Sequence, residues 1–185
     1  RPDELLAPPG YEIHRTPGPR TGWAPVVWDA TTWQAIDRGT VQISSRPKKI
    51  KSGMVGVRYA NWVTLVNAEQ QVVSVVSSHI APNNKDTAEL LVPSLLQLQA
   101  LTAQLSAVGP VNIGGDFNMG YRSTRYQPSY LQAVGLQSTF DLLGNAFPTH
   151  RKGGIIDYVF IGPSDRISVA GHYPVAMESD HSMLV

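Results

Sequence analysis

The sequence predicts a mixed α/β protein in which one β-sheet packs on another and helices lie outside them. Short runs rich in β-branched and aromatic residues outnumber the helical segments. Their order is hairpins, helix, strand, helix and strands, which differs from the regular alternation of a doubly wound parallel sheet. With 185 residues and no repeat or linker, the chain is expected to form a single domain, 1–185.

The first half of the chain is predicted to be mostly β-structure. Residues 24–29 and 39–44 are expected to form two strands joined by a short turn. Residues 53–67 and 70–80 are expected to pair as a hairpin, because β-branched and aromatic side chains dominate both arms. The second arm ends at Ser-Ser-His, so the hairpin brings polar residues to the end of an apolar strand.

One long helix is predicted between residues 86 and 109. Pro93 fits an early turn of this helix better than its interior, and Gly109-Pro110 ends it. The leucines that recur at helical spacing are Leu91, Leu95, Leu98, Leu101 and Leu105.

The second half of the chain alternates short strands with short helices. Residues 110–117 are predicted to be a buried strand, and 129–135 a short helix. Two more strands are expected at 155–162 and 165–175, and residues 179–184 form a loop that leads into a last strand. Polar residues gather where these strands end, which is where open α/β structures place their functional side chains.

The composition excludes several classes of protein. Apolar residues make up 42% and charged residues 16%, which is typical of a globular domain. A net charge of +1 provides no overall field that would steer the protein onto nucleic acid, and the basic run at 46–51 is expected to be a solvated loop between strands. Without cysteine there is no disulfide, thiolate zinc site or cysteine nucleophile. No run is long enough to span a membrane, no targeting segment is visible, and no compartment is indicated.

The stretch Gly-Gly-Asp-Phe-Asn at 114–118 follows the buried strand directly. Its glycines permit a sharp turn and a close approach to another surface. Asp116 and Asn118 would face the same side if the backbone stayed extended, and their oxygens suit a hard divalent cation, or a phosphate and an attacking water. The same residues are equally natural in an Asx turn after a strand, so the tetrapeptide alone leaves both interpretations open.

Three further sites carry polar residues with weaker individual signals. His79 ends an apolar strand, where a histidine is more often a hydrogen-bonded rim residue than a catalyst. Asp157 lies inside an apolar run, so it needs a cationic or hydrogen-bonding partner, for which a histidine is the natural choice. Asp180 and His181 stand near the end of the chain, in a context that could also be ordinary surface.

Taken in order, these motifs resemble those of the endonuclease/exonuclease/phosphatase superfamily, which includes deoxyribonuclease I. The resemblance covers the chain from about residue 10 to its last residue and carries four motifs in the right order. It implies a DNase I-like, four-layered α/β sandwich of two mainly antiparallel sheets flanked by helices. It also implies cleavage of a phosphate ester with the help of Mg²⁺ or Mn²⁺.

The resemblance assigns a role to each matching position. His79 would contact the phosphate or protonate the leaving group, Asp116 would orient or deprotonate the attacking water, and Asn118 would bind a phosphate oxygen. Asp157 would hold His181, the catalytic histidine of the last motif. Asp180 would be a carboxylate on the metal side of the site.

The family pattern also includes an N-terminal strand ending in Asn and a strand ending in Gln-Glu, whose Glu ligates the metal. Neither motif occurs in this sequence. Asp3 and Glu4 resemble first-turn helix residues rather than replacements for that ligand. The expectation is therefore either that the natural protein is longer at this end, or that the chain is a degenerate or truncated copy, acting as a binding module without catalysis.

Substrate choice within this family lies in loops. The candidate substrate-binding residues are Asn83, Tyr121, Arg122 and Arg125, since rings and cations suit phosphates and stacked bases. The alternative is a solvent-facing loop whose tyrosines pack back on the core. His150, Arg151 and Lys152 could also line the cleft. The sequence thus predicts a monomeric, metal-dependent nuclease or phosphodiesterase whose partner is nucleic acid or another phosphodiester.

Overall fold

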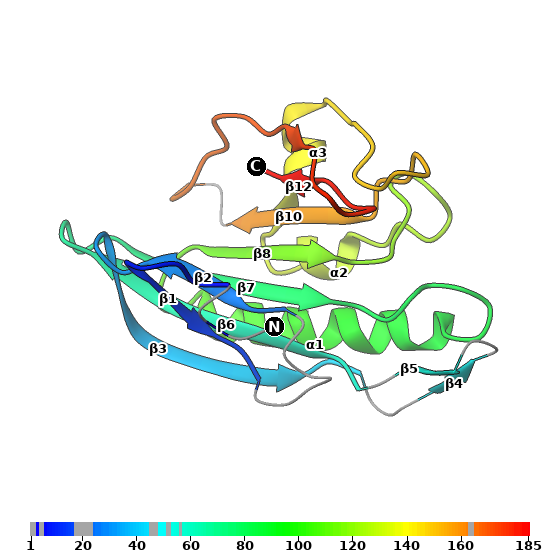
Figure 1. Cartoon of the computed structure of the whole chain (residues 1–185), viewed down its shortest axis with the longest axis horizontal. Coiled ribbons are helices and arrows are strands. Elements are labelled where there is room, and N and C mark those ends of the chain that lie inside the picture. The colour runs from blue at the N-terminus through cyan, green and yellow to red at the C-terminus, as the bar shows by residue number, and fades with distance from the viewer. Residues whose placement is uncertain are drawn as a thin grey trace.

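The fold is built around one six-stranded sheet with the strand order β3-β6-β7-β8-β10-β9 (Figure 1). The computed structural model describes residues 3, 6–16, 24–44, 48–50, 53–55, 57–162 and 165–185. Neighbouring strands of the sheet are antiparallel, except that β7 and β8 run parallel. The predicted fold class, α/β with mainly antiparallel pairing, is confirmed.

The strands of this sheet other than β9, which was not predicted, lie close to the predicted segments, and β6 and β7 form the predicted hairpin. The strand expected at 39–44 begins earlier, with a register shift between Ala35 and Asp37 where it pairs with β6. The strands are β3 (Trp33–Gln42), β6 (Tyr59–Asn67), β7 (Val72–His79), β8 (Val111–Asp116), β9 (Gln137–Ser138) and β10 (Asp157–Gly162).

Helix α1 (Leu91–Leu105) covers one face of the sheet and is preceded by the 3-10 turn η2 (Ala88–Leu90). It forms the crossover that a parallel pair such as β7 and β8 requires. All five leucines named above are buried, and Pro93 lies in the first turn, as predicted. Within the described residues, no helix combines the length and apolar character needed to cross a bilayer.

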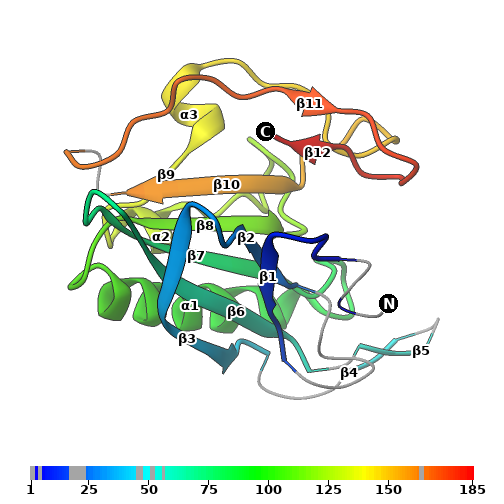
Figure 2. The ribbon, with the colours of Figure 1, turned by 60° about the vertical axis from the view of Figure 1, so that its left-hand side comes forward.

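The opposite face of the sheet is covered by a small ribbon, β1 (Tyr11–His14) paired with β2 (Val26–Asp29). Val26 and Trp28 pack against Val63 and Leu65 of β6. A second ribbon, β11 (Pro174–Val175) with β12 (Met183–Leu184), lies beyond β10 (Figure 2). The second sheet expected from the sequence is thus represented, among the described residues, by short ribbons.

The strand predicted at 165–175 is wrong except for its last two residues. His172 turns inward between Phe140 and Phe147 and bonds the hydroxyl of Thr139 at 3.0 Å. This packing holds the segment against α3 (Thr139–Leu143) instead of pairing it with a strand. The other short helix, α2 (Ser129–Gln132), falls where it was predicted.

The basic run at 46–51 is also not simply a loop. Residues 48–50 form β4 (Lys48–Ile50), which pairs with β5 (Gly53–Val55). Residues 46, 47 and 51 lie outside the described residues, as does Glu4.

Candidate active site

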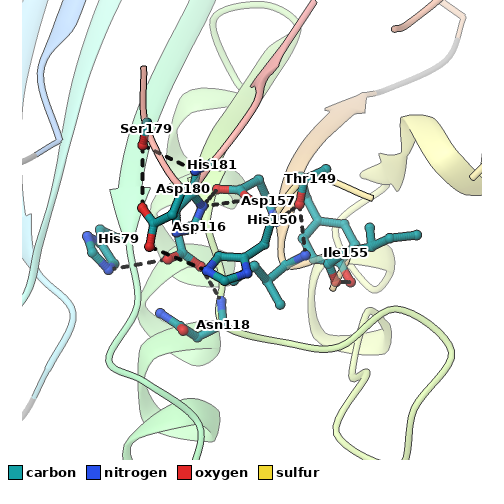
Figure 3. A network of polar contacts seen from close by, with 12 residues as sticks. His79, Asp116, Asn118, Thr149, His150, Ile155, Asp157, Ser179, Asp180 and His181 are labelled. Carbon is teal, nitrogen blue, oxygen red and sulfur yellow. Dashed lines mark hydrogen bonds and ion pairs between the residues drawn. The ribbon is translucent and has the colours of Figure 1, made fainter. Parts of the chain in front are cut away.

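A row of polar side chains lies where β7 and β8 end and the antiparallel strand β10 begins. In the sheet register, His79 of β7 is the partner of Asp116 of β8, and Asp116 is the partner of Asp157 of β10. The sequence places these residues up to 78 positions apart, yet the ladder sets them side by side (Figure 3). His181 completes the group, and one ligand atom each of Asp116, Asp157 and His181 lie within 4.8 Å of one another.

The close approach of β7 and β8 depends on Gly115. Its φ is +141°, a conformation that L side chains rarely adopt. A Cβ atom at this position would overlap the backbone carbonyl of Ser78. The second glycine of the motif therefore allows His79 and Asp116 to meet at the edge of the sheet.

Asp116 and Asn118 are arranged by a turn, not by an extended backbone. The backbone N–H of Asn118 donates to Asp116 Oδ1 at 2.8 Å, and Asn118 has a φ of 50°. Phe117 between them is fully buried in the core. The Asx-turn interpretation is therefore correct in geometry, but it does not exclude a functional role, because Asp116 still lies within the polar group.

The side chain of Asn118 also ties the turn to the neighbouring strand. Its Nδ2 donates to the carbonyl of Ile80 at 2.9 Å. The Ile80 N–H in turn donates to the carbonyl of Asp116 at 2.9 Å. These bonds leave the side-chain oxygen Oδ1 of Asn118 and the second N–H of Nδ2 unused.

His79 Nε2 lies 3.5 Å from Asp116 Oδ2, but the two do not form an ordinary salt bridge. Burial, together with the charges of Arg58 and His181, lowers the pKa of His79 to about 4. Burial also raises the pKa of Asp116 to about 6. The hydrogen bond from the backbone N–H of Asn118 lowers this pKa, and the negative charge of Asp157 raises it further. At neutral pH the imidazole is therefore uncharged.

Asp157 has the histidine partner that its buried position requires. Its Oδ1 and Oδ2 lie 3.0 and 2.9 Å from Nδ1 of His181. Burial opposes the charged form of His181, but this bond and the charges of Asp157, Asp116 and Asp180 outweigh it, so its pKa is raised above the ordinary value. The backbone at Asp157 is fixed by Thr149, whose buried hydroxyl accepts the N–H groups of Ile156 and Asp157, both at 3.1 Å.

Asp180 lies at the rim of the group, with its side chain 64% exposed. Its Oδ2 is 3.5 Å from Nε2 of His150, a residue that sequence analysis placed only at the edge of the cleft. His150 and His181 face each other across an antiparallel bridge, with ring centroids 4.8 Å apart. The structure thus brings His150 into the site.

The predicted substrate-binding residues lie in two loops that contact each other. Arg125 donates to the backbone carbonyl of Asn83 at 2.6 Å. The Tyr121 hydroxyl donates to Asp141 at 2.8 Å, and its ring packs on Phe140. The Arg122 guanidinium lies 5.0 Å from the centre of the Tyr121 ring. Tyr121 therefore packs back on the core, and the substrate-binding role of all four residues stays a prediction.

Two residues of the site were not singled out from the sequence. Arg58 acts electrostatically on both His79 and Asp116, and burial lowers its own pKa. The available signal was a cation immediately before an apolar strand. Thr149 had no signal, because a buried threonine in a loop looks like any other.

Solved structures with this fold are similar to the chain at low sequence identity. An endonuclease/exonuclease/phosphatase from Bacteroides vulgatus is 19% identical, with a TM-score of 0.66, and the match covers 84% of this chain and 66% of that one. A mannosyl-6-phosphatase from Bacteroides thetaiotaomicron is 19% identical (TM-score 0.64; 96% and 78% covered). A truncated Caenorhabditis elegans TDP2 is 12% identical (TM-score 0.68; 98% and 75% covered).

The chain spans about two thirds to three quarters of the length of these three solved chains. No family model and no curated protein sequence matches it. The structural likeness nevertheless covers 84% to 98% of the chain, so the chain shares the fold of these endonuclease/exonuclease/phosphatase structures.

Proposed function

We propose that the protein is a metal-dependent phosphoesterase that hydrolyses phosphodiester bonds by attack of water, as a nuclease or phosphodiesterase does. The observation that supports this most is the convergence of His79, Asp116, Asp157 and His181 at one edge of the sheet. The fold is shared with a mannosyl-6-phosphatase and with TDP2, which is consistent with phosphate-ester chemistry.

His181 is proposed as the histidine that exchanges a proton during the reaction. Because Asp157 accepts the hydrogen bond from Nδ1, Nε2 is the nitrogen left for proton transfer. Asp157 also stabilises the charged ring. The pair is therefore suited to both removing and returning a proton near neutral pH.

Asp116 is proposed to orient the attacking water through a carboxylate oxygen. Its hydrogen bond from the Asn118 amide fixes the carboxylate, and its raised pKa makes it a better proton acceptor than an exposed aspartate. His79 is uncharged at neutral pH and is proposed to contact the phosphate or the leaving oxygen. Asn118 would bind a phosphate oxygen through an N–H of its side-chain amide.

The charges of the site fit a divalent cation. Asp116 and Asp157 are adjacent and largely buried, and the charge of Asp157 helps to raise the pKa of Asp116, so a cation held by Asp116 would relieve this repulsion. Asp180 and Asp116 are the carboxylates proposed to hold Mg²⁺ or Mn²⁺, both of which prefer oxygen ligands. Such an ion supplies positive charge for the phosphate oxygens that become more negative as the bond breaks.

Purified protein should be tested on plasmid DNA and on bis(p-nitrophenyl) phosphate, with Mg²⁺ or Mn²⁺ and then with excess EDTA. The proposal expects turnover that requires the cation and is restored when the cation is returned. A p-nitrophenyl phosphate assay in parallel separates a phosphodiesterase from a phosphomonoesterase. Tight binding of DNA without any hydrolysis would instead indicate the non-catalytic binding module.

A further inference from the structure

A second group of possible ligands lies on the outer side of His181. One ligand atom each of His150, Asp180 and His181 lie within 4.8 Å of one another. Two imidazoles and one carboxylate form a donor set typical of Zn²⁺ and similar borderline cations, whereas Mg²⁺ prefers oxygen alone. His150 takes no part in the reaction proposed above.

The separation between His150 and Asp180 fits a bound ion better than a hydrogen bond. Nε2 of His150 and Oδ2 of Asp180 are 3.5 Å apart, which is too long for a strong N–H···O contact. In a tetrahedral zinc site with bonds of about 2.0–2.1 Å, neighbouring ligand atoms lie about 3.4 Å apart. The pair thus already has the spacing of two ligands on a shared ion.

The backbone holds the two histidines together without any ion. His150 and His181 form an antiparallel bridge, and the Ser182 N–H donates to the carbonyl of Thr149 at 2.8 Å. The Arg151 N–H donates to the carbonyl of Asp180 at 2.8 Å. A site whose ligands are already brought together in this way loses little conformational entropy when it binds.

The protonation of His181 also suits a metal. Its Nδ1 is bonded to Asp157, so the other nitrogen carries the lone pair, as in the carboxylate–histidine–zinc arrangement of many sites. His150 needs one change, because its Nδ1 accepts the Lys152 N–H at 3.1 Å, which places its proton on Nε2. Moving that proton to Nδ1 exposes the Lys152 amide to water, at a cost of about 1 kcal/mol in this exposed turn.

We propose that His150, Asp180 and His181 form a binding site for Zn²⁺ or a similar borderline cation, through two imidazole nitrogens and one carboxylate oxygen. The ion leaves a ligand position open to solvent. Because it occupies Nε2 of His181, it prevents that nitrogen from exchanging a proton. The inhibition that follows rests on the proposed function, whereas the binding does not.

Binding should be measured without substrate, by titrating metal-free protein with Zn²⁺ against a chromophoric chelator. We expect one Zn²⁺ per chain, and at least about tenfold weaker binding in His150→Asn and in Asp180→Asn. The matched controls are His14→Asn in β1 and Glu178→Gln, an exposed residue two positions before Asp180, both expected to bind as wild type does. Thermal melts followed by circular dichroism establish that each variant is folded.

A folded His150→Asn variant that binds Zn²⁺ as tightly as wild type would overturn the proposal. If that variant does not fold, NMR spectra of uniformly ¹⁵N-labelled wild-type protein still decide the question. One equivalent of Zn²⁺ should shift Nε2 of His150 and of His181 together with the Lys152 amide. Unchanged His150 resonances would contradict the site.

The consequence for activity is tested separately. With saturating Mg²⁺, micromolar Zn²⁺ should inhibit wild-type hydrolysis, and each variant is compared with its own rate without Zn²⁺. Zinc binding without any hydrolase activity would leave this site standing and remove the proposed function. Hydrolysis that Zn²⁺ does not affect, in a protein that binds no zinc, would support the proposed function and remove the zinc site.

Discussion

His79 and Asp116 lie 3.5 Å apart at the ends of two parallel strands, and burial is the largest influence on the pKa of both. The pKa of His79 falls to about 4 and that of Asp116 rises to about 6. Each group thus favours its uncharged form in the folded protein, so a residue pair that resembles a salt bridge is held largely neutral near pH 5.

These shifts predict opposite pH dependences of stability. Because the folded pKa of Asp116 is raised, its contribution falls as the pH rises from 3.8 to about 6. Because the folded pKa of His79 is lowered, its contribution rises from about pH 4 to 6.5. Each contribution is about 3 kcal/mol, and in the wild-type protein the two nearly cancel.

Single substitutions should expose each contribution. As the pH rises from 4 to 6.5, the stability of Asp116→Asn relative to wild type should increase, because only the His79 contribution remains in the variant. His79→Gln should lose stability relative to wild type over the same range. Urea unfolding in the presence of a chelator measures both, with Glu178→Gln as the control. Parallel curves for the two variants would show that these pKa shifts do not exist.

Asp157→Asn should impair turnover without unfolding the protein. The amide cannot stabilise a charged His181, and it can hold the ring in the wrong tautomer, which costs about 10²- to 10⁴-fold in comparable pairs. The rate should fall mainly in kcat, and the pKa of His181 measured by NMR should drop. An unchanged pH–rate profile would count against the pairing, and Glu178→Gln provides the control for a lost surface carboxylate.

Gly115→Ala should destabilise the protein by about 3 kcal/mol or more. The positive φ and the overlap with the Ser78 carbonyl would force β7 and β8 apart. Gly171→Ala is the matched control, since a Cβ there meets open space. Chemical denaturation measures the free energies of unfolding, and similar values for the two variants would refute the requirement for glycine.

Local composition was enough to predict the main elements. The apolar arms of β6 and β7, the leucines of α1 and the run leading to Asp116 were each recognisable, because side chains on a pleated strand or an amphipathic helix follow its period. The strand predicted at 165–175 was wrong because that prediction depended on periodicity alone. Its alternation resembles a strand, but the inward packing of His172 is a tertiary contact that periodicity does not encode.

The motifs of the site and one of its contacts were predictable from the sequence. The partner of Asp157 could be expected, since a buried carboxylate must be satisfied. Arg58 and His150 reach the site through the strand register and through a bridge between distant loops. These contacts depend on the whole fold, so the sequence did not reveal Arg58 and placed His150 only at the cleft, without its contact with His181.

The central claim is that His181, oriented by Asp157, serves a cation-dependent phosphodiester hydrolysis. Its most direct test is the turnover of bis(p-nitrophenyl) phosphate by wild type and by His181→Ala, each with Mg²⁺ and then with EDTA. The claim predicts that EDTA stops the wild-type reaction, and that the variant is at least about 10²-fold slower with an unchanged thermal melt. Wild-type turnover from a folded His181→Ala variant would contradict it.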